Sequence, residues 1–126
     1  MKSLFISAFI VIILITSWII IYNFIEKSVH NINSMLSEME DKIYNNNWNS
    51  AVSIYNDIYI KWKNTKKVLM LVIEHEEMEK INLTLEKIKK YISINDKSLS
   101  IGETAALKYF LNHIREKESL SLHNIF

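Results

Sequence analysis

The longest apolar stretch of the chain lies near its start, from Leu4 to Ile25, and none of its 22 residues is charged. Fifteen of them are Leu, Ile, Val or Phe, and Ile13 lies near the middle. As an α-helix, the stretch would extend about 33 Å, which matches a bilayer hydrocarbon core of about 30 Å. The pattern therefore predicts a membrane-spanning helix from Leu4 to Ile25.

Two other interpretations of this stretch are less favourable. A cleaved signal peptide has a shorter apolar region of about 7–15 residues and a small-residue cleavage site, which Tyr22–Glu26 lacks. A buried core helix would need more cover than the rest of this 126-residue chain provides. We therefore interpret residues 1–27 as a transmembrane signal anchor and residues 28–126 as one helical domain.

The charges that flank the predicted span indicate its orientation. Lys2 and the terminal amino group precede it, whereas Lys27 follows it and the next lysine is Lys42. The excess of positive charge near the N-terminus places that end in the cytoplasm and the domain outside the cell. We therefore expect a single-pass protein of the cell membrane that contacts lipid through its span.

Beyond the span, apolar residues recur at alternating intervals of three and four, the spacing of an α-helical seam. The first seam, Tyr22–Ile43, begins inside the span, and further seams follow over Trp48–Val72, Met78–Ile92 and Leu99–Ile114. One glycine and no proline leave few turn residues for β-structure. The pattern predicts an all-α fold, either a four-helix bundle or two stacked helix hairpins similar to tetratricopeptide repeats.

Several local features refine this prediction. The apolar run Val68–Ile73 is too short to cross a bilayer, so either the bundle encloses it or it faces a partner, and we favour enclosure. We expect the fourth helix to start near Asp96 to Ser100, where Ser100 and Glu103 have the spacing of a capping box. The tail Leu120–Phe126 is apolar, and we expect it to fold back over the bundle. The predicted core face of the fourth helix is Leu99, Ala106, Phe110 and Ile114, with Leu107 and Leu111 alongside.

The Tyr22–Ile43 seam has two candidate partners. It can pack on the later helices of its own chain, or on the same seam of a second copy in a homodimer. The matching seams downstream favour packing within the chain.

Composition excludes several function classes. The absence of cysteine excludes thiol chemistry and disulfides. Residues 28–126 carry 13 basic and 13 acidic residues, so the basic excess of a nucleic-acid-binding protein is missing. No catalytic signature is present, and we predict a protein that is not an enzyme and uses no cofactor.

A cluster of lysines on the second predicted helix is a candidate interaction face: Lys61, Lys63, Lys66 and Lys67. The common interpretation of such a cluster is a solvated helix surface. The more specific one is a contact with phosphate, a phospholipid headgroup or an anionic cell-wall polymer.

The run that follows Ile73 contains the candidate metal ligands His75, Glu76 and Glu79, to which His113 could add a fourth. His75 and Glu79 are four residues apart and share a helix face, but the H-E-x-x-H pattern of zinc proteases is absent. Glutamates at a helix start also suit its dipole. A metal- or ligand-binding sensor centred on this turn is the alternative function. A hydrolase that uses Glu76 and Glu79 ranks below it.

Several short motifs resemble one known family. They are the start Met1-Lys2-Ser3-Leu4, the Asn-Asn-x-Trp48 turn, His75-Glu76-Glu77, and the close from His113 to Phe126. The chain resembles the domain of unknown function family 4363, small single-pass membrane proteins of spore-forming Gram-positive bacteria. The resemblance implies a partnership with a multi-pass membrane protein of the YetF-like class. Together with the residue pattern, it favours a non-enzymatic interaction or accessory module for an envelope membrane protein.

Overall fold

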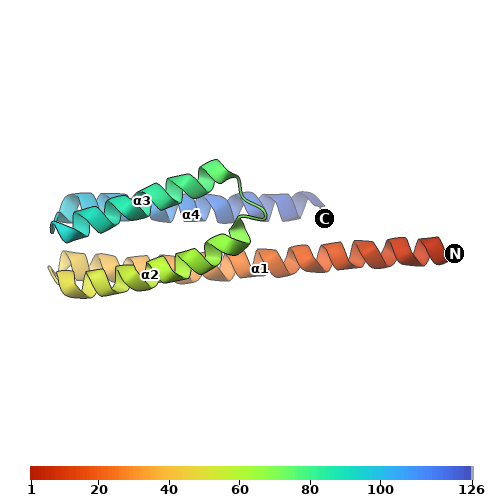
Figure 1. Cartoon of the computed structure of the whole chain (residues 1–126), viewed down its shortest axis with the longest axis horizontal. Coiled ribbons are helices and arrows are strands. Elements are labelled where there is room, and N and C mark those ends of the chain that lie inside the picture. Colours follow the sequence, from red (N-terminus) through yellow and green to blue (C-terminus); the bar gives the residue numbers. More distant parts are fainter. Residues whose placement is uncertain (126) are drawn as a thin grey trace.

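The computed structural model describes residues 1–125, with side chains through Glu118, and its elements are four helices. They are α1 (Lys2–Tyr44), α2 (Trp48–Leu69), α3 (His75–Ser93) and α4 (Lys97–Ile125). Figure 1 shows two antiparallel hairpins, α1 with α2 and α3 with α4, that lie side by side. Because α1 also packs along α4, the first and last helices close a four-helix bundle. The all-α prediction is confirmed, in its bundle form.

The first helix belongs to two parts of the molecule. Residues 1–14 are exposed on every side, and among the described residues α1 is the one helix long and apolar enough to cross a membrane. It then enters the bundle without interruption (Figure 1). Its buried seam consists of Ile25, Val29, Ile32, Leu36, Met39 and Ile43, each at most 1% exposed. The surface considered for a homodimer is therefore part of the chain's own core.

Asparagine and aspartate residues form the turns at one end of the bundle. Asn46 and Asn95 adopt positive φ values of 58° and 56°, a conformation that asparagine tolerates. Asn47 Oδ1 accepts a hydrogen bond from the Ser50 amide at 3.3 Å and caps α2. Asp96 Oδ1 accepts one from the Leu99 amide at 3.0 Å and caps α4 in the same way.

The prediction of a capping box at Ser100 and Glu103 is therefore wrong. Asp96 already caps the helix, so α4 begins at Lys97 and Ser100 lies fully buried within it. The predicted core face is rotated: Leu107, Leu111 and Ile114 are buried as expected, but Ala106 and Phe110 are only half-buried. Leu99 is 47% exposed. The buried positions of α4 are Ser100, Thr104, Leu107, Leu111, Ile114 and Glu118.

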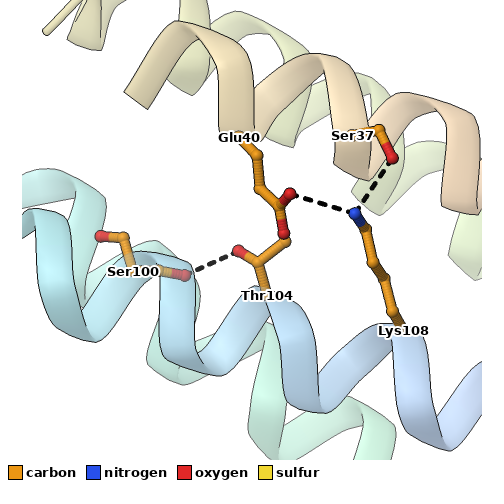
Figure 2. Close-up of polar contacts among 5 residues, drawn as sticks. All are labelled: Ser37, Glu40, Ser100, Thr104 and Lys108. Carbon is orange, nitrogen blue, oxygen red and sulfur yellow. Dashed lines mark hydrogen bonds and ion pairs between the residues drawn. The ribbon is translucent and has the colours of Figure 1, made fainter. Parts of the chain in front are cut away.

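Two small hydroxyl residues explain this rotation of α4. Thr104 Oγ1 donates to the Ser100 carbonyl at 2.7 Å, so its hydroxyl group is satisfied inside the helix and can be buried (Figure 2). Small side chains at Ser100 and Thr104 also allow α4 to approach its neighbours closely. A pattern that counts apolar residues alone does not detect such a face.

Polar contacts fix the register of α4 against α1. Lys108 Nζ donates to Ser37 Oγ at 3.0 Å and to Glu40 Oε2 at 3.1 Å (Figure 2). Further along the interface, Asn33 Nδ2 donates to Asn112 Oδ1 at 2.9 Å. A shift of α4 by one residue would break these bonds.

The prediction that the bundle encloses Val68–Ile73 is also wrong. Leu69 is fully buried, but α2 ends there, and the next residues, Met70 and Leu71, are 61% and 74% exposed. The chain must turn at this point to begin α3. At the other end of the chain, α4 continues as a helix to Ile125. Side chains after Glu118 lie outside the described residues, and so does the predicted cover of the bundle by the tail.

Replacement of Leu36 by alanine tests the seam of α1. Leu36 is fully buried, so Leu36→Ala should lower the free energy of unfolding by about 2–5 kcal/mol. The matched control is Leu83→Ala, because Leu83 is 58% exposed and its truncation should cost less than about 0.5 kcal/mol. Denaturant unfolding of the full chain in detergent micelles measures both. Equal losses would contradict the assignment of the core.

Candidate functional site

The surface of the bundle is hollowed between α2 and α3, the neighbouring helices that contact each other least. We call this hollow the α2–α3 groove. Its volume is about 380 Å³. The lining residues are Tyr59, Trp62, Lys63, Lys66, Lys67 and Met70 from α2, and Asn82, Leu85 and Glu86 from α3.

Two hydrogen bonds between the helices hold the groove in shape. The indole N–H of Trp62, a residue only 2% exposed, donates to Asn82 Oδ1 at 2.9 Å. The Tyr55 hydroxyl donates to the Leu85 carbonyl at 2.7 Å. The aromatic side chains of α2 therefore form a floor that is apolar and joined to α3 by specific polar bonds.

The rim of the groove is positively charged. Lys63, Lys66 and Lys67 stand along its α2 side, and Glu86 is the one carboxylate in the lining. None of the ion pairs among side chains up to Glu118 involves these three lysines. The Lys63 ammonium lies 5.8 Å from the centre of the Tyr59 ring, a cation–π contact. The groove therefore attracts anionic groups.

Helical spacing explains why these lysines gather. Lys63, Lys66 and Lys67 are three and four residues apart, so they project from one face of α2. Lys61, the fourth lysine of the predicted cluster, does not line the groove. The sequence thus predicts the basic side of the groove, but it gives no signal that Asn82 and Glu86 of α3 lie opposite.

The predicted metal ligands do not form a metal site. His75 Nε2 lies 3.7 Å from Glu79 Oε1, and both side chains are largely exposed. His113 stacks on Tyr109 of α4 instead. Among the described residues, no group of three or more histidine, aspartate or glutamate side chains is placed to hold a metal ion. Glu76 lies in the first turn of α3, as expected for an acidic helix start.

His75 and Glu79 instead line a smaller hollow of about 270 Å³. Lys66 and Met70 line both this hollow and the α2–α3 groove. The two hollows thus adjoin at the end of α2, and the His75 turn lies at the mouth of the groove.

Ser37 and Lys108 have the residue types of a catalytic pair, because a serine can act as a nucleophile and a neighbouring lysine as its general base. In this structure, however, the Lys108 ammonium bonds to the Glu40 carboxylate as well (Figure 2). A carboxylate at 3.1 Å stabilises the protonated amine, whereas a general base must be deprotonated. We interpret the three residues as a structural link between α1 and α4.

With this geometry established, comparison with known proteins identifies the family. The model of a domain of unknown function, DUF4363, matches residues 19–125. The chain belongs to the DUF4363 family. The family description assigns no activity. Searches of curated proteins and of solved structures found no match.

Tyr55, beneath the groove, gives the protein a pH dependence. Burial raises the pKa of Tyr55 above its ordinary value of 10.0, and the nearby Glu86 and Tyr59 raise it further. A raised pKa means that the folded state holds the phenolic proton more tightly than the unfolded state does. This contribution to stability is complete below pH 10 and is lost as the pH rises above it.

Replacement of Tyr55 by phenylalanine tests this dependence. At pH 7, Tyr55→Phe should lower the free energy of unfolding by about 1 kcal/mol, because it removes the hydrogen bond to the Leu85 carbonyl. Above pH 10, the stability of the variant should fall less steeply than that of the natural chain. The difference between the two slopes should approach about 1.4 kcal/mol per pH unit. Tyr109→Phe, at a tyrosine that is 67% exposed, is the control and should follow the natural chain. Denaturant unfolding between pH 7 and 11 measures all three, and parallel slopes would contradict the role of Tyr55.

Proposed function

We propose that this chain is a non-enzymatic interaction module, a membrane-anchored helical bundle whose α2–α3 groove binds an acidic segment of another membrane protein. One observation carries the proposal. The groove combines an apolar aromatic floor with three lysines that have no carboxylate partner among the described side chains. Surfaces of this kind complement a segment that presents both apolar and acidic side chains.

The size of the groove limits what it binds. A volume of about 380 Å³ holds a few side chains rather than a whole helix. Tyr59 and Met70, which are 39% and 61% exposed, offer apolar contact to such side chains, and the lysines supply charge-assisted hydrogen bonds. The partner class that the family resemblance implies is a multi-pass membrane protein of the YetF-like class.

Anchoring by α1 is part of the proposal. Ile25 is both the last residue of the apolar stretch and a core residue that is 1% exposed. Cleavage near the end of the stretch would therefore cut into a helix that the bundle needs. This supports a retained single-pass anchor over a cleaved signal sequence. The charge of Lys2 supports a cytoplasmic N-terminus and a bundle outside the cell.

Photocrosslinking tests the groove. A photoreactive phenylalanine analogue at Tyr59 in living cells should crosslink one membrane protein, identified by mass spectrometry. The same analogue at Tyr109, on α4, should not crosslink it.

The double charge reversal Lys63→Glu with Lys67→Glu should reduce the crosslinking yield at Tyr59 at least about tenfold, because it replaces attraction by repulsion. Lys80→Glu, at an exposed lysine that lines neither hollow, should leave the yield unchanged. An unchanged yield in the double variant would overturn the proposal.

Cysteine labelling tests the orientation, because the chain has no cysteine of its own. Asn49 is exposed in the first turn of α2, at the end of the bundle far from the apolar stretch. In intact cells, Asn49→Cys should react with a membrane-impermeant maleimide. Reaction only after lysis would place the bundle in the cytoplasm and contradict the proposed topology.

A further inference from the structure

The turn between α2 and α3 presents apolar side chains where a loop usually presents polar ones. We call Met70–Ile73 the apolar turn. Met70 and Leu71 are 61% and 74% exposed, whereas Val72 and Ile73 are half-buried against the core. The exposed pair continues a run that begins inside the bundle at Leu69.

The backbone amides of the apolar turn already have hydrogen-bond partners. The amides of Met70 and Leu71 donate to the carbonyls of Lys66 and Val68 at 2.9 and 3.1 Å. Those of Val72 and Ile73 both donate to the carbonyl of Leu69, at 3.0 and 2.8 Å. Because its amides are satisfied, the turn brings fewer unpaired backbone groups into the hydrated headgroup region of a membrane than an open loop would.

Ion pairs show where this turn lies along the bundle. Glu74, the next residue, accepts from Lys117 Nζ at 3.4 Å. Two residues earlier on α4, Arg115 lies 3.7 Å from Glu26 of α1. Glu26 is the first charged residue after the Leu4–Ile25 stretch. Because two helical residues rise only about 3 Å, the turn is nearly level with the end of that stretch.

Figure 1 shows the same arrangement. The connection between α2 and α3 lies at the end of the bundle that faces the N-terminal part of α1; α4 extends past it beside α1, and α1 then continues alone toward the N-terminus. The opposite end carries the two turns that contain Asn46 and Asn95. The exposed apolar side chains of the turn are therefore at the end of the bundle that faces the candidate membrane span.

We propose that the apolar turn inserts Met70 and Leu71 into the headgroup region of the membrane that α1 enters. This would be a second lipid contact that fixes the bundle against the bilayer, and it rests on the proposed anchoring by α1. Glu76 and Glu79 follow the turn, so the nearby charges are mixed despite Lys66 and Lys67. Apolar burial rather than net charge thus drives the contact, which should form on neutral phosphatidylcholine as well as on anionic lipid.

The contact also gives the α2–α3 groove a location. Met70 lines the groove, so one end of the groove lies beside the apolar turn. A partner segment in the groove would then lie next to the bilayer. This is where the flanking segments of a multi-pass protein are found.

Depth-dependent fluorescence quenching tests the proposal on the full chain in phosphatidylcholine vesicles. A single cysteine replaces Met70, and a polarity-sensitive nitrobenzoxadiazole dye labels it. Ile94→Cys is the matched control, because Ile94 is equally exposed, at 61%, but lies at the far end of the bundle. Ile13→Cys, in the middle of the apolar stretch, reports on the anchor itself.

The proposal predicts a blue-shifted emission at position 70. Lipids spin-labelled in the headgroup region should quench that dye at least about twofold more than the dye at position 94. Lipids labelled deep in the acyl chain should quench position 13 most. Quenching at 13, with positions 70 and 94 alike, would overturn the proposed contact and leave the anchor intact. A dye at 13 that no lipid quenches would overturn the anchor.

A second outcome at position 70 would also overturn the proposal. A blue shift without quenching by any spin-labelled lipid would mean that protein, such as a second copy of the chain, covers the turn. Dilution of the chain to one copy per vesicle distinguishes these cases. A lipid contact should survive the dilution, whereas a contact between copies should be lost.

Discussion

The packing of α2 and α4 on one unbroken face of α1 is the contact on which the rest of the structure depends. The buried residues of that face run from Ile25 to Ile43 without a polar interruption other than Ser28. Since α1 is also the helix that carries the apolar stretch, the bundle is attached to that stretch through its own core rather than through a linker. Any rotation or tilt of the apolar stretch would therefore be transmitted directly to the bundle.

This arrangement also explains why the candidate site lies between α2 and α3. These two helices are joined mainly through their separate contacts with α1 and α4, and they touch each other least. The gap between them is bridged by aromatic side chains whose polar atoms bond across it, Trp62 to Asn82 and Tyr55 to the Leu85 carbonyl. A groove remains above this floor, and because α2 presents lysines there, its character is basic.

The two ends of the bundle differ in polarity. At the far end, Asn46, Asn47, Asn95 and Asp96 form hydrogen-bonded turns that suit water. At the end nearer the apolar stretch, the turn between α2 and α3 is apolar. Ion pairs from Lys117 and Arg115 of α4, to Glu74 and Glu26, place this turn near the end of the apolar stretch. A bundle that stands on a membrane meets lipid at one end and water at the other, and these turns match that difference.

The sequence by itself determined the helices, because each presents apolar residues at helical intervals and turns rich in asparagine separate the first from the second and the third from the fourth. It also determined the apolar stretch and the lysine cluster, since both depend only on spacing along one helix. Three features were decided by tertiary structure alone. The core face of α4 includes two small hydroxyl residues, Ser100 and Thr104, and the Thr104 hydroxyl is satisfied by the Ser100 carbonyl, so this face is not marked by hydrophobicity. The exposure of Met70 and Leu71 depends on where α2 must end so that α3 can return. The position of Asn82 and Glu86 opposite the lysines in the groove depends on the contact between α2 and α3, which no local pattern encodes.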